Sequence, residues 1–335
     1  MLLSVKNPHP LDELLTFNEE AHVYTYVPTN EAVRISVSGI LGRFFPNAFD
    51  GPAVARKYYD RWSNDPTSKY HALCSYLSNV QKLSQDQAAV EICRLWEETG
   101  RNARDKGTEM HKTLEDYLNG VWKPPPPLPG GDGKSPGTPP HEIMCYLDFV
   151  ENFYPELQLV PWRTEFKMVL LDKIEHNGTT VTYPVACGTI DLIMRDKLGR
   201  FFLFDWKRVD PKSKGKLGKR KASNASTSFP DPDALGFLKS YKSDAFTKYS
   251  AQLLAYRYIF EKMYLTPGQE VAGSFIVQIH PDLPQAHGIE AAEGLNDDFE
   301  YCVYECMDDE VQRARGERRA LLDGPNAHYI HDADF

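Results

Sequence analysis

The sequence lacks any long apolar run, and few of its 335 residues are cysteines. No stretch approaches the roughly 18 consecutive apolar residues of a membrane span, and the opening MLLSVK is too short for a secretory signal. The six cysteines form no CxxC pair, and the closest two, Cys302 and Cys306, are spaced for one helix face. We therefore expect an intracellular protein, cytoplasmic or nuclear, with free thiols and no membrane partner.

The chain also lacks an overall positive charge, since its net charge is −9. Positive charge is concentrated between residues 207 and 221, where one acid, Asp210, accompanies eight bases. Only nearby charge survives screening beyond roughly 8–10 Å, so an acidic protein with such a run can still contact phosphates. The bases are Lys207, Arg208, Lys212, Lys214, Lys216, Lys219, Arg220 and Lys221.

The basic run passes into Ser-, Asn- and Thr-rich sequence, which predicts a flexible loop over about residues 210–230. Three interpretations of this loop remain open. It binds DNA through Arg208 and the lysines and arginine that follow, it is a nuclear-localisation signal, or it is a solvated insertion. A proline-rich stretch at residues 123–140 predicts an exposed linker, with a protein partner as a further hypothesis.

Two apolar runs, Thr189–Met194 and Phe201–Trp206, flank the turn sequence DKLGR and predict a β-hairpin. If the turn centres on Leu198, Asp191 faces Asp205. Carboxylates placed opposite each other repel unless a cation lies between them. Lys207 points to the same face as Asp205, because strand side chains alternate. The pattern favours a metal site, whereas an Asp-x-Lys triplet alone is more often a solvated strand face.

These residues resemble motifs of a known superfamily. The segments Gly188–Asp191 and Asp205–Lys207 resemble motifs II and III of the PD-(D/E)XK nucleases, in the branch of RecB-like and phage- or virus-type exonucleases. GTEMHKTLE, from Gly107 to Glu115, resembles the helical GTxxHxxxE motif of that branch, and Gln252–Tyr256 resembles its QxxxY motif. The four motifs occur in the family's order.

The resemblance implies a metal-dependent deoxyribonuclease. It places Mg²⁺ or Mn²⁺ on His111, Asp191, Asp205 and the backbone carbonyl of Trp206. Glu165, on a predicted strand, and Glu115, one turn after His111, are further candidate ligands. The catalytic set that it implies comprises Lys207, Asp205, Asp191, Gln252 and Tyr256. Because the C-terminal cysteine cluster of some relatives is missing, no iron–sulfur cluster is expected.

The expected fold is α/β, with a restriction-endonuclease-like core in which helices flank a mixed sheet. An N-terminal region, residues 1–100, would contain a hairpin over 17–38 and helical sequence, and the nuclease core would occupy 101–335. Strands are predicted near 160–171, 180–207 and 271–280. Helices are predicted over 102–118, 141–153, 235–263 and 307–322.

We expect an exonuclease that hydrolyses DNA from a free, single-stranded end, since most relatives with the GTxxHxxxE motif process ends. Three alternatives remain: an endonuclease of the same fold, a catalytically idle DNA-binding module, and an unrelated metalloenzyme such as an iron oxygenase. The last requires a second histidine near the site, and His176 and His280 lie in no such motif.

Overall fold

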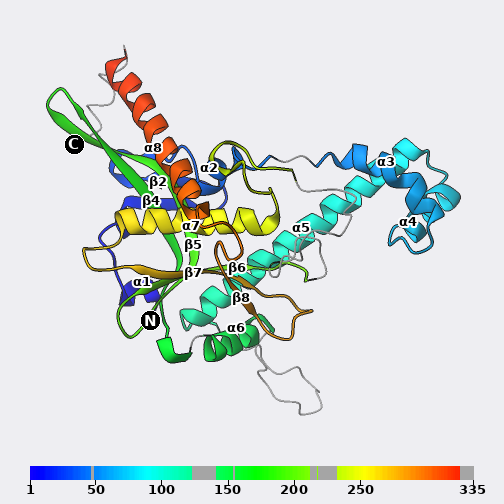
Figure 1. Ribbon diagram of the computed structural model, residues 1–335, viewed down its shortest axis with the longest axis horizontal. Coiled ribbons are helices and arrows are strands. Elements are labelled where there is room, and N and C mark those ends of the chain that lie inside the picture. The colour runs from blue at the N-terminus through cyan, green and yellow to red at the C-terminus, as the bar shows by residue number, and fades with distance from the viewer. Residues whose placement is uncertain (47–48, 123–140, 154, 212–216, 218–231, 325–335) are drawn as a thin grey trace. The chain divides into compact units, whose positions relative to one another are not determined.

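A computed structural model describes residues 1–46, 49–122, 141–153, 155–211, 217 and 232–324 (Figure 1). The predicted linker and most of the predicted basic loop lie outside these ranges. The chain forms two compact units, one of residues 1–46 and 110–335 and the other of residues 47–109. This division differs from the predicted boundary at residue 100, because the N-terminal strands pack against the main sheet and one helix runs through that boundary.

The unit of residues 47–109 is helical, as its sequence predicts. It contains α3 (Gly51–Asn64), α4 (His71–Ser75), a π-helical turn (Tyr76–Val80) and the first part of α5 (Gln85–Leu118). The side chain of Asp50 accepts a hydrogen bond from Ala53 N and caps α3. Buried residues from α3, the α4 region and α5 form a small core of their own.

The other unit is built on a mixed five-stranded sheet in the order β4-β5-β6-β7-β8. β5 (Thr179–Arg195) pairs antiparallel with both of its neighbours, β4 (Val160–His176) and β6 (Phe201–Lys207). β7 (Val271–Gln278) runs parallel to β6, and β8 (His287–Glu290) pairs with β7. The prediction of a mixed α/β sheet is confirmed, although β8 was not predicted.

The β5–β6 hairpin has the predicted register. Leu192 pairs with Phe204 and Met194 with Phe202, so the turn centres on Leu198. Side chains of β6 alternate between two cores: Phe201 and Leu203 enter one, and Phe202 and Phe204 enter the other. Both faces of β6 are therefore buried. Its last residues, which include Asp205 and Lys207, lie at the edge of the two apolar cores.

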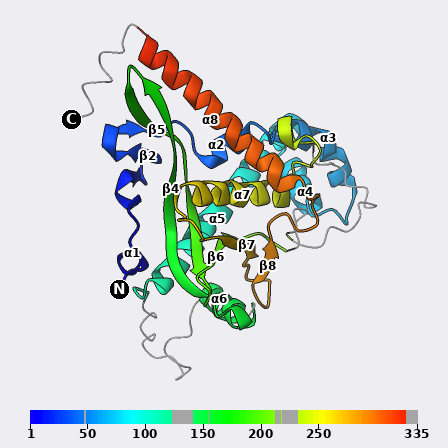
Figure 2. The ribbon, with the colours of Figure 1, turned by 60° about the vertical axis from the view of Figure 1, so that its left-hand side comes forward.

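Helices cover both faces of this sheet (Figure 2). The first core contains residues of α2 (Val37–Gly42), α7 (Ala245–Met263) and α8 (Phe299–Asp323). The second contains residues of α6 (His141–Asn152) and the end of α5. This layering places α7 over one face of β5 and β6 and the last turns of α5 against the other.

The N-terminal segment forms α1 (Leu3–Lys6), a 3-10 turn (Asp12–Leu14) and a small antiparallel sheet of β1 (Leu15–Asn18), β2 (Val23–Tyr26) and β3 (Glu31–Ala32). The prediction of a second strand reaching Ser38 is wrong. A 3-10 turn (Val27–Thr29) separates β2 from β3. Ser36 instead caps α2 by accepting from Gly39 N, which starts the helix at Val37.

Two predicted helix starts are also wrong. Residues 236–238 form a 3-10 turn (Gly236–Leu238), and α7 begins only at Ala245, where Asp244 accepts a hydrogen bond from Thr247 N as the cap. α8 begins at Phe299, eight residues before the predicted start, because Phe299 and Val303 join the core. Another 3-10 turn (Pro155–Leu157) precedes β4.

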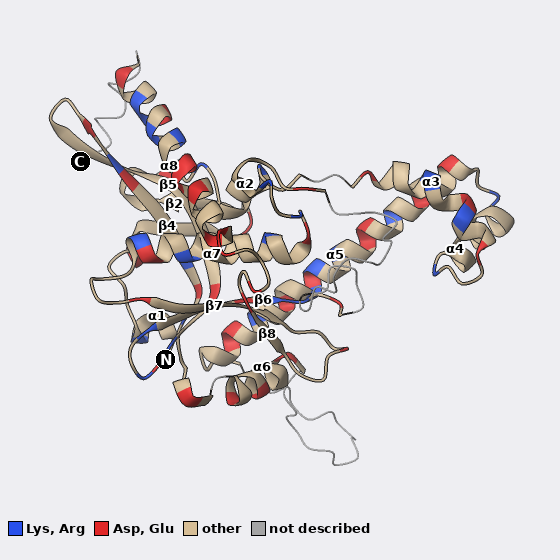
Figure 3. Cartoon of the chain, in the orientation of Figure 1, with Lys and Arg blue, Asp and Glu red and all other residues tan. Residues whose placement is uncertain are grey.

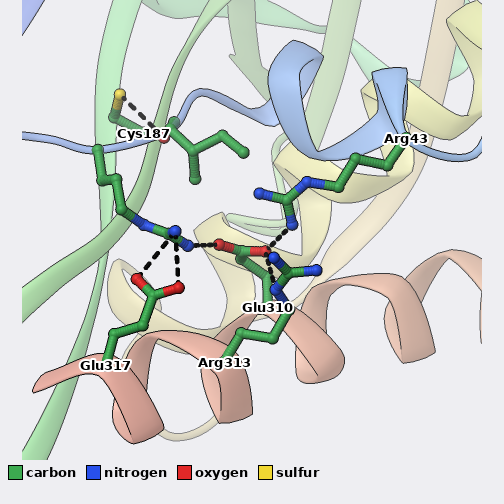
Figure 4. Close-up of polar contacts among 7 residues, drawn as sticks. Arg43, Cys187, Glu310, Arg313 and Glu317 are labelled. Carbon is green, nitrogen blue, oxygen red and sulfur yellow. Dashed lines mark hydrogen bonds and ion pairs between the residues drawn. The ribbon is translucent and has the colours of Figure 1, made fainter. Parts of the chain in front are cut away.

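A buried carboxylate anchors α8 to the segment around α2. Glu310 is almost fully buried and pairs with Arg34 and Arg43, while Arg313 lies 3.8 Å away (Figure 4). Arg34 also contacts Glu317 at 2.9 Å. Removing one partner of such a buried pair leaves an uncompensated charge, so these contacts fix where α8 lies.

Charged side chains occur along the helices, with acids mainly in the first half of α8 and arginines in its second half (Figure 3). Among the described residues, none of the helices combines the length and the apolar character that crossing a membrane would need.

A second ion pair holds α8 to the long β4–β5 hairpin. Arg315 donates to both oxygens of Asp172, at 2.9 and 2.8 Å, and Tyr183 donates to Oδ2 of Asp172 at 2.5 Å. Burial acts to raise the pKa of Asp172, but the hydrogen bonds from Arg315 and Tyr183 outweigh it and hold that pKa below its ordinary value.

Because the folded pKa of Asp172 is depressed, this pair stabilises the protein above the ordinary pKa of 3.8 and ceases to do so as the pH falls through the folded value. We expect Arg315→Gln to lower the free energy of unfolding by about 1 kcal/mol at pH 7, a modest effect because Arg315 is two-fifths exposed. The difference should shrink below about pH 4, as measured by urea unfolding. Arg319→Gln, an exposed arginine of the same helix, is the control, and a loss that does not depend on pH would contradict the assignment.

Candidate active site

Three side chains from α5, β4 and β5 converge on one point. The ligand-type atoms of His111, Glu165 and Asp191 all lie within 4.8 Å of one another. Nδ1 of His111 is 3.4 Å from Oδ1 of Asp191 and 3.7 Å from Oε1 of Glu165. The sequence predicted His111 and Asp191 as ligands, and the structure adds Glu165, which the sequence marked only as a further candidate.

The strands are irregular where these acids lie. Thr164 pairs with Leu192 and Phe166 with Ile190, so Glu165 and Asp191 lie opposite each other on β4 and β5. Glu165 has φ = 43°, in the left-handed region that residues with a side chain rarely adopt. Such a conformation costs of order 1–3 kcal/mol and persists only where the surroundings impose it.

The side-chain alternation of β5 also shifts by one residue at Asp191. Ile190 and Ile193 join the first core, whereas Leu192 and Met194 join the second. β5–β6 pairing ends at Leu192 and Phe204, and beyond that point Trp206 N donates to the side chain of Asp191 at 2.6 Å. The side-chain carboxylate of Asp191 therefore accepts the hydrogen bond that a backbone carbonyl would accept in a continuous β-ladder.

Asp205 and Lys207 continue the charged row on β6. Nζ of Lys207 lies 2.5 Å from Oδ2 of Asp205, and only 2% of the residue surface of Asp205 is exposed. Oδ2 is thus a buried acceptor whose charge is met by the ammonium of Lys207. Asp205 is not a member of the His111 group. Glu165, Asp191 and Asp205 thus occupy neighbouring positions on three adjacent strands.

Burial makes the charges of this row costly. Burial raises the pKa of Asp205 to about 6, against the opposing effect of Lys207. Burial likewise raises the pKa of Glu165, although the contact with His111 opposes it. For Asp191, the contacts with His111 and Lys207 and the Trp206 N–H outweigh burial and lower the pKa. For His111, burial disfavours the imidazolium, but Asp191 and Glu165 outweigh it and raise the pKa to about 10.

The second ring nitrogen of His111 contacts the backbone of β6. Nε2 lies 3.2 Å from the carbonyl oxygen of Trp206, so this nitrogen donates when it carries a proton. A hydrogen bond at Nε2 directs Nδ1 toward Glu165 and Asp191, an arrangement common for metal-binding histidines. In this arrangement the Trp206 carbonyl, expected as a metal ligand, orients the imidazole.

Gln252 and Tyr256, predicted on one helix face, both lie on α7, and Nε2 of Gln252 donates to the Tyr256 hydroxyl at 2.9 Å. The ring of Tyr256 packs on Gly188, where any Cβ would overlap it, so glycine is required there. Gln252 also lies 3.5 Å from the hydroxyl of Ser38 on α2. Burial raises the pKa of Tyr256 far above its usual range, which keeps the phenol protonated.

Two other residues expected in the site, Glu115 and Arg208, are not in the His111 group. The Glu115 carboxylate contacts Lys112 at 3.1 Å and is not in the His111 group. Arg208 follows β6 directly and is partly exposed. The remaining bases expected to bind DNA, from Lys212 to Lys221, lie outside the described residues.

Two tyrosines near the site were not predicted from the sequence. The Tyr24 hydroxyl is 2.7 Å from Oγ1 of Thr189, two residues before Asp191. The ring of Tyr249 lies 4.9 Å from Nζ of Lys207. Helical spacing was a usable signal for Tyr249, since it precedes Gln252 by three residues on α7. No local pattern links Tyr24 to Thr189.

Comparisons with known proteins give no family assignment: no family model matches the chain, and no curated protein does. Among solved structures, one described as "Crystal structure of SSO0001" is similar at 15% identity, with a TM-score of 0.22. The similarity covers 50% of this chain and 56% of that one, so this chain spans little more than half the length of the solved structure. A TM-score this low does not establish a shared fold.

The backbone and charge of Glu165 lead to a stability test. We expect Glu165→Asn to raise the free energy of unfolding of the metal-free protein by about 1 kcal/mol at pH 7, because asparagine tolerates positive φ and a carboxyl whose pKa burial raises is removed. The measurement is urea unfolding in the presence of a chelator. Glu115→Gln, which removes an acid outside the group, should bring no such gain, and a destabilised Glu165→Asn would contradict the assigned strain.

Proposed function

We propose that the protein is a metal-dependent nuclease with a restriction-endonuclease-like core. The observation that carries the proposal is the row of Glu165, Asp191 and Asp205 on three adjacent strands, beside His111 and Lys207. Three carboxylates on neighbouring strands destabilise a fold, and such acids are typical of sites that hold a hard cation. The mixed sheet flanked by helices is consistent with the fold implied by the resemblance.

The donor set fits a divalent ion. Nδ1 of His111 and carboxylate oxygens of Glu165 and Asp191 lie close enough together to share one cation, and the buried carboxylate of Asp205 is held by the ammonium of Lys207. Oxygen-rich sites suit Mg²⁺, and the imidazole is better tolerated by Mn²⁺. Such an ion, when bound, polarises a phosphate oxygen and lowers the pKa of its water.

The chain's own groups supply the remaining requirements for phosphodiester hydrolysis. Lys207, held at the end of β6, is placed to stabilise negative charge that grows on the phosphate. Because Gln252 donates to the Tyr256 hydroxyl, the hydroxyl's own proton remains available to a phosphate oxygen. The apolar cores on both sides of β6 exclude water from around Asp205, which strengthens its interactions.

The proposed substrate is DNA with a free, single-stranded end, as the GTxxHxxxE resemblance implies. An endonuclease of the same fold and an idle DNA-binding module are the competing functions. Linear DNA degraded while circular single strands survive would support the exonuclease, whereas equal rates would identify an endonuclease. Binding without degradation in any metal would identify the idle module.

The chemistry is tested with purified protein, end-labelled DNA and either Mg²⁺ or Mn²⁺. We expect Asp205→Asn and Lys207→Met each to lower kcat about 10²-fold or more, since loss of a metal ligand or charge stabiliser usually has that effect. Glu115→Gln is the matched control and should retain activity. Thermal unfolding in each metal accompanies the assay, because a ligand at 100 times its Kd stabilises by about 2.7 kcal/mol. Activity within about tenfold of wild type in both site variants would overturn the assignment.

The basic run is tested separately through DNA affinity. We expect replacement of its six last bases with serine to flatten the dependence of affinity on salt, because each lost phosphate contact lowers the log–log slope by about 0.7 for single strands. Turnover at saturating DNA should change little. An unchanged slope would favour the localisation signal, tested by where a tagged protein accumulates in a eukaryotic cell. The replaced residues are Lys212, Lys214, Lys216, Lys219, Arg220 and Lys221.

A further inference from the structure

Lys207 has a second neighbour that no motif includes. Its ammonium lies 2.5 Å from the carboxylate of Asp205 and 4.9 Å from the centre of the Tyr249 ring. The lysine side chain is only 16% exposed, so the ring acts on a largely desolvated cation. The face of an aromatic ring attracts a desolvated cation more strongly than it attracts a solvent-exposed cation.

Tyr249 belongs to the same face of α7 as Gln252 and Tyr256. The spacing of three and then four residues aligns all three side chains along one side of the helix. Tyr249 is partly buried and packs against the first core, which restricts the motion of its ring. The helix that places Gln252 and Tyr256 therefore also provides a fixed surface for Lys207.

The ring contact differs in kind from the ion pair. Asp205 holds Lys207 by charge, and that attraction weakens as soon as the carboxylate is shared with another cation. The Tyr249 ring carries no charge, so its attraction for the ammonium does not depend on where the carboxylate points. Of the two contacts, only the one with the ring is independent of the charge state of the acidic row.

We propose that Tyr249 is a positioning residue that holds the Lys207 ammonium over the reacting phosphate through a cation–π contact. This inference rests on the proposed nuclease function. It assigns the role to the ring and not to the hydroxyl. Tyr249→Phe should therefore preserve the positioning of Lys207. Tyr249→Leu, which fills similar space without an aromatic face, should abolish it.

The contact itself is tested without any cleavage. In protein labelled with ¹³C at the lysine ε-carbon, the Lys207 signal is assigned by its loss in Lys207→Arg. We expect a ring-current shift of this signal in the wild type and in Tyr249→Phe, and its loss in Tyr249→Leu. An unmoved signal in Tyr249→Leu would overturn the proposal.

The role is tested by cleavage of single-stranded DNA. We expect Tyr249→Leu to lower kcat about tenfold to thirtyfold while KM changes less than threefold, the size of a desolvated cation–π contact. Tyr249→Phe should stay within about twofold of wild type, and both variants should bind Mn²⁺ as wild type does. An equal loss of kcat in the two variants would overturn the proposal by assigning the effect to the hydroxyl.

The same helix offers a matched control. Nζ of Lys262 lies 5.1 Å from the Tyr258 ring, a contact of similar distance on α7 that involves an exposed lysine and none of the site residues. Tyr258→Leu should move the Lys262 signal and lower stability without lowering kcat, and a loss of kcat as large as that of Tyr249→Leu would overturn the proposal. If the wild type cleaves no nucleic acid in any metal, the proposed function is overturned, and the ring-current shift alone still decides whether Tyr249 holds Lys207.

Discussion

Repulsion among three carboxylates is the constraint on which the arrangement of the sheet depends. Glu165, Asp191 and Asp205 lie on adjacent strands with apolar cores on either side, where charge is poorly screened. His111 and Lys207 offset part of this repulsion from α5 and β6. Burial raises the pKa of both Glu165 and Asp205, and the nearby charge of Asp191 adds to this rise. The fold thus maintains a cluster that destabilises it, which is the usual mark of a functional site.

Much of the surrounding structure fixes the positions of these charges. The ladder opens at Asp191, where the Trp206 N–H turns to a carboxylate oxygen. Gly188 lets the Tyr256 ring approach β5 closely, and so brings α7 against the strand that carries Asp191. On the side of α8, the pairing of Glu310 with Arg34 and Arg43 holds the segment that contains α2. Ion pairs distant from the row therefore help to place Ser38 beside Gln252.

The parts predicted from the sequence were those set by local rules. A short turn fixes hairpin register, so counting from Leu198 gave the observed pairing up to Leu192 and Phe204, although the ladder ends there and Asp191 accepts from Trp206 N. Helical spacing placed Gln252 beside Tyr256. Glu165 was harder, because its partner depends on the non-local β4–β5 pairing and its backbone departs from strand geometry. The start of α7 was missed because apolar residues near Leu238 join the core through a 3-10 turn, without helical periodicity.

The net charge of the row helps to distinguish a metal-dependent hydrolase from a module that only binds DNA. With all five groups ionised, three carboxylates face two cations, so the row carries a net charge of −1. Such a row repels a phosphodiester. A protein that only bound DNA would gain nothing from this charge, because the acids weaken the attraction for phosphates. A divalent cation, if bound, would reverse the sign of the local field, with the same carboxylates as its ligands. The cost of keeping three acids together, two of them buried, would then be matched by a chemical use, which is an argument for the proposed hydrolase over the idle module.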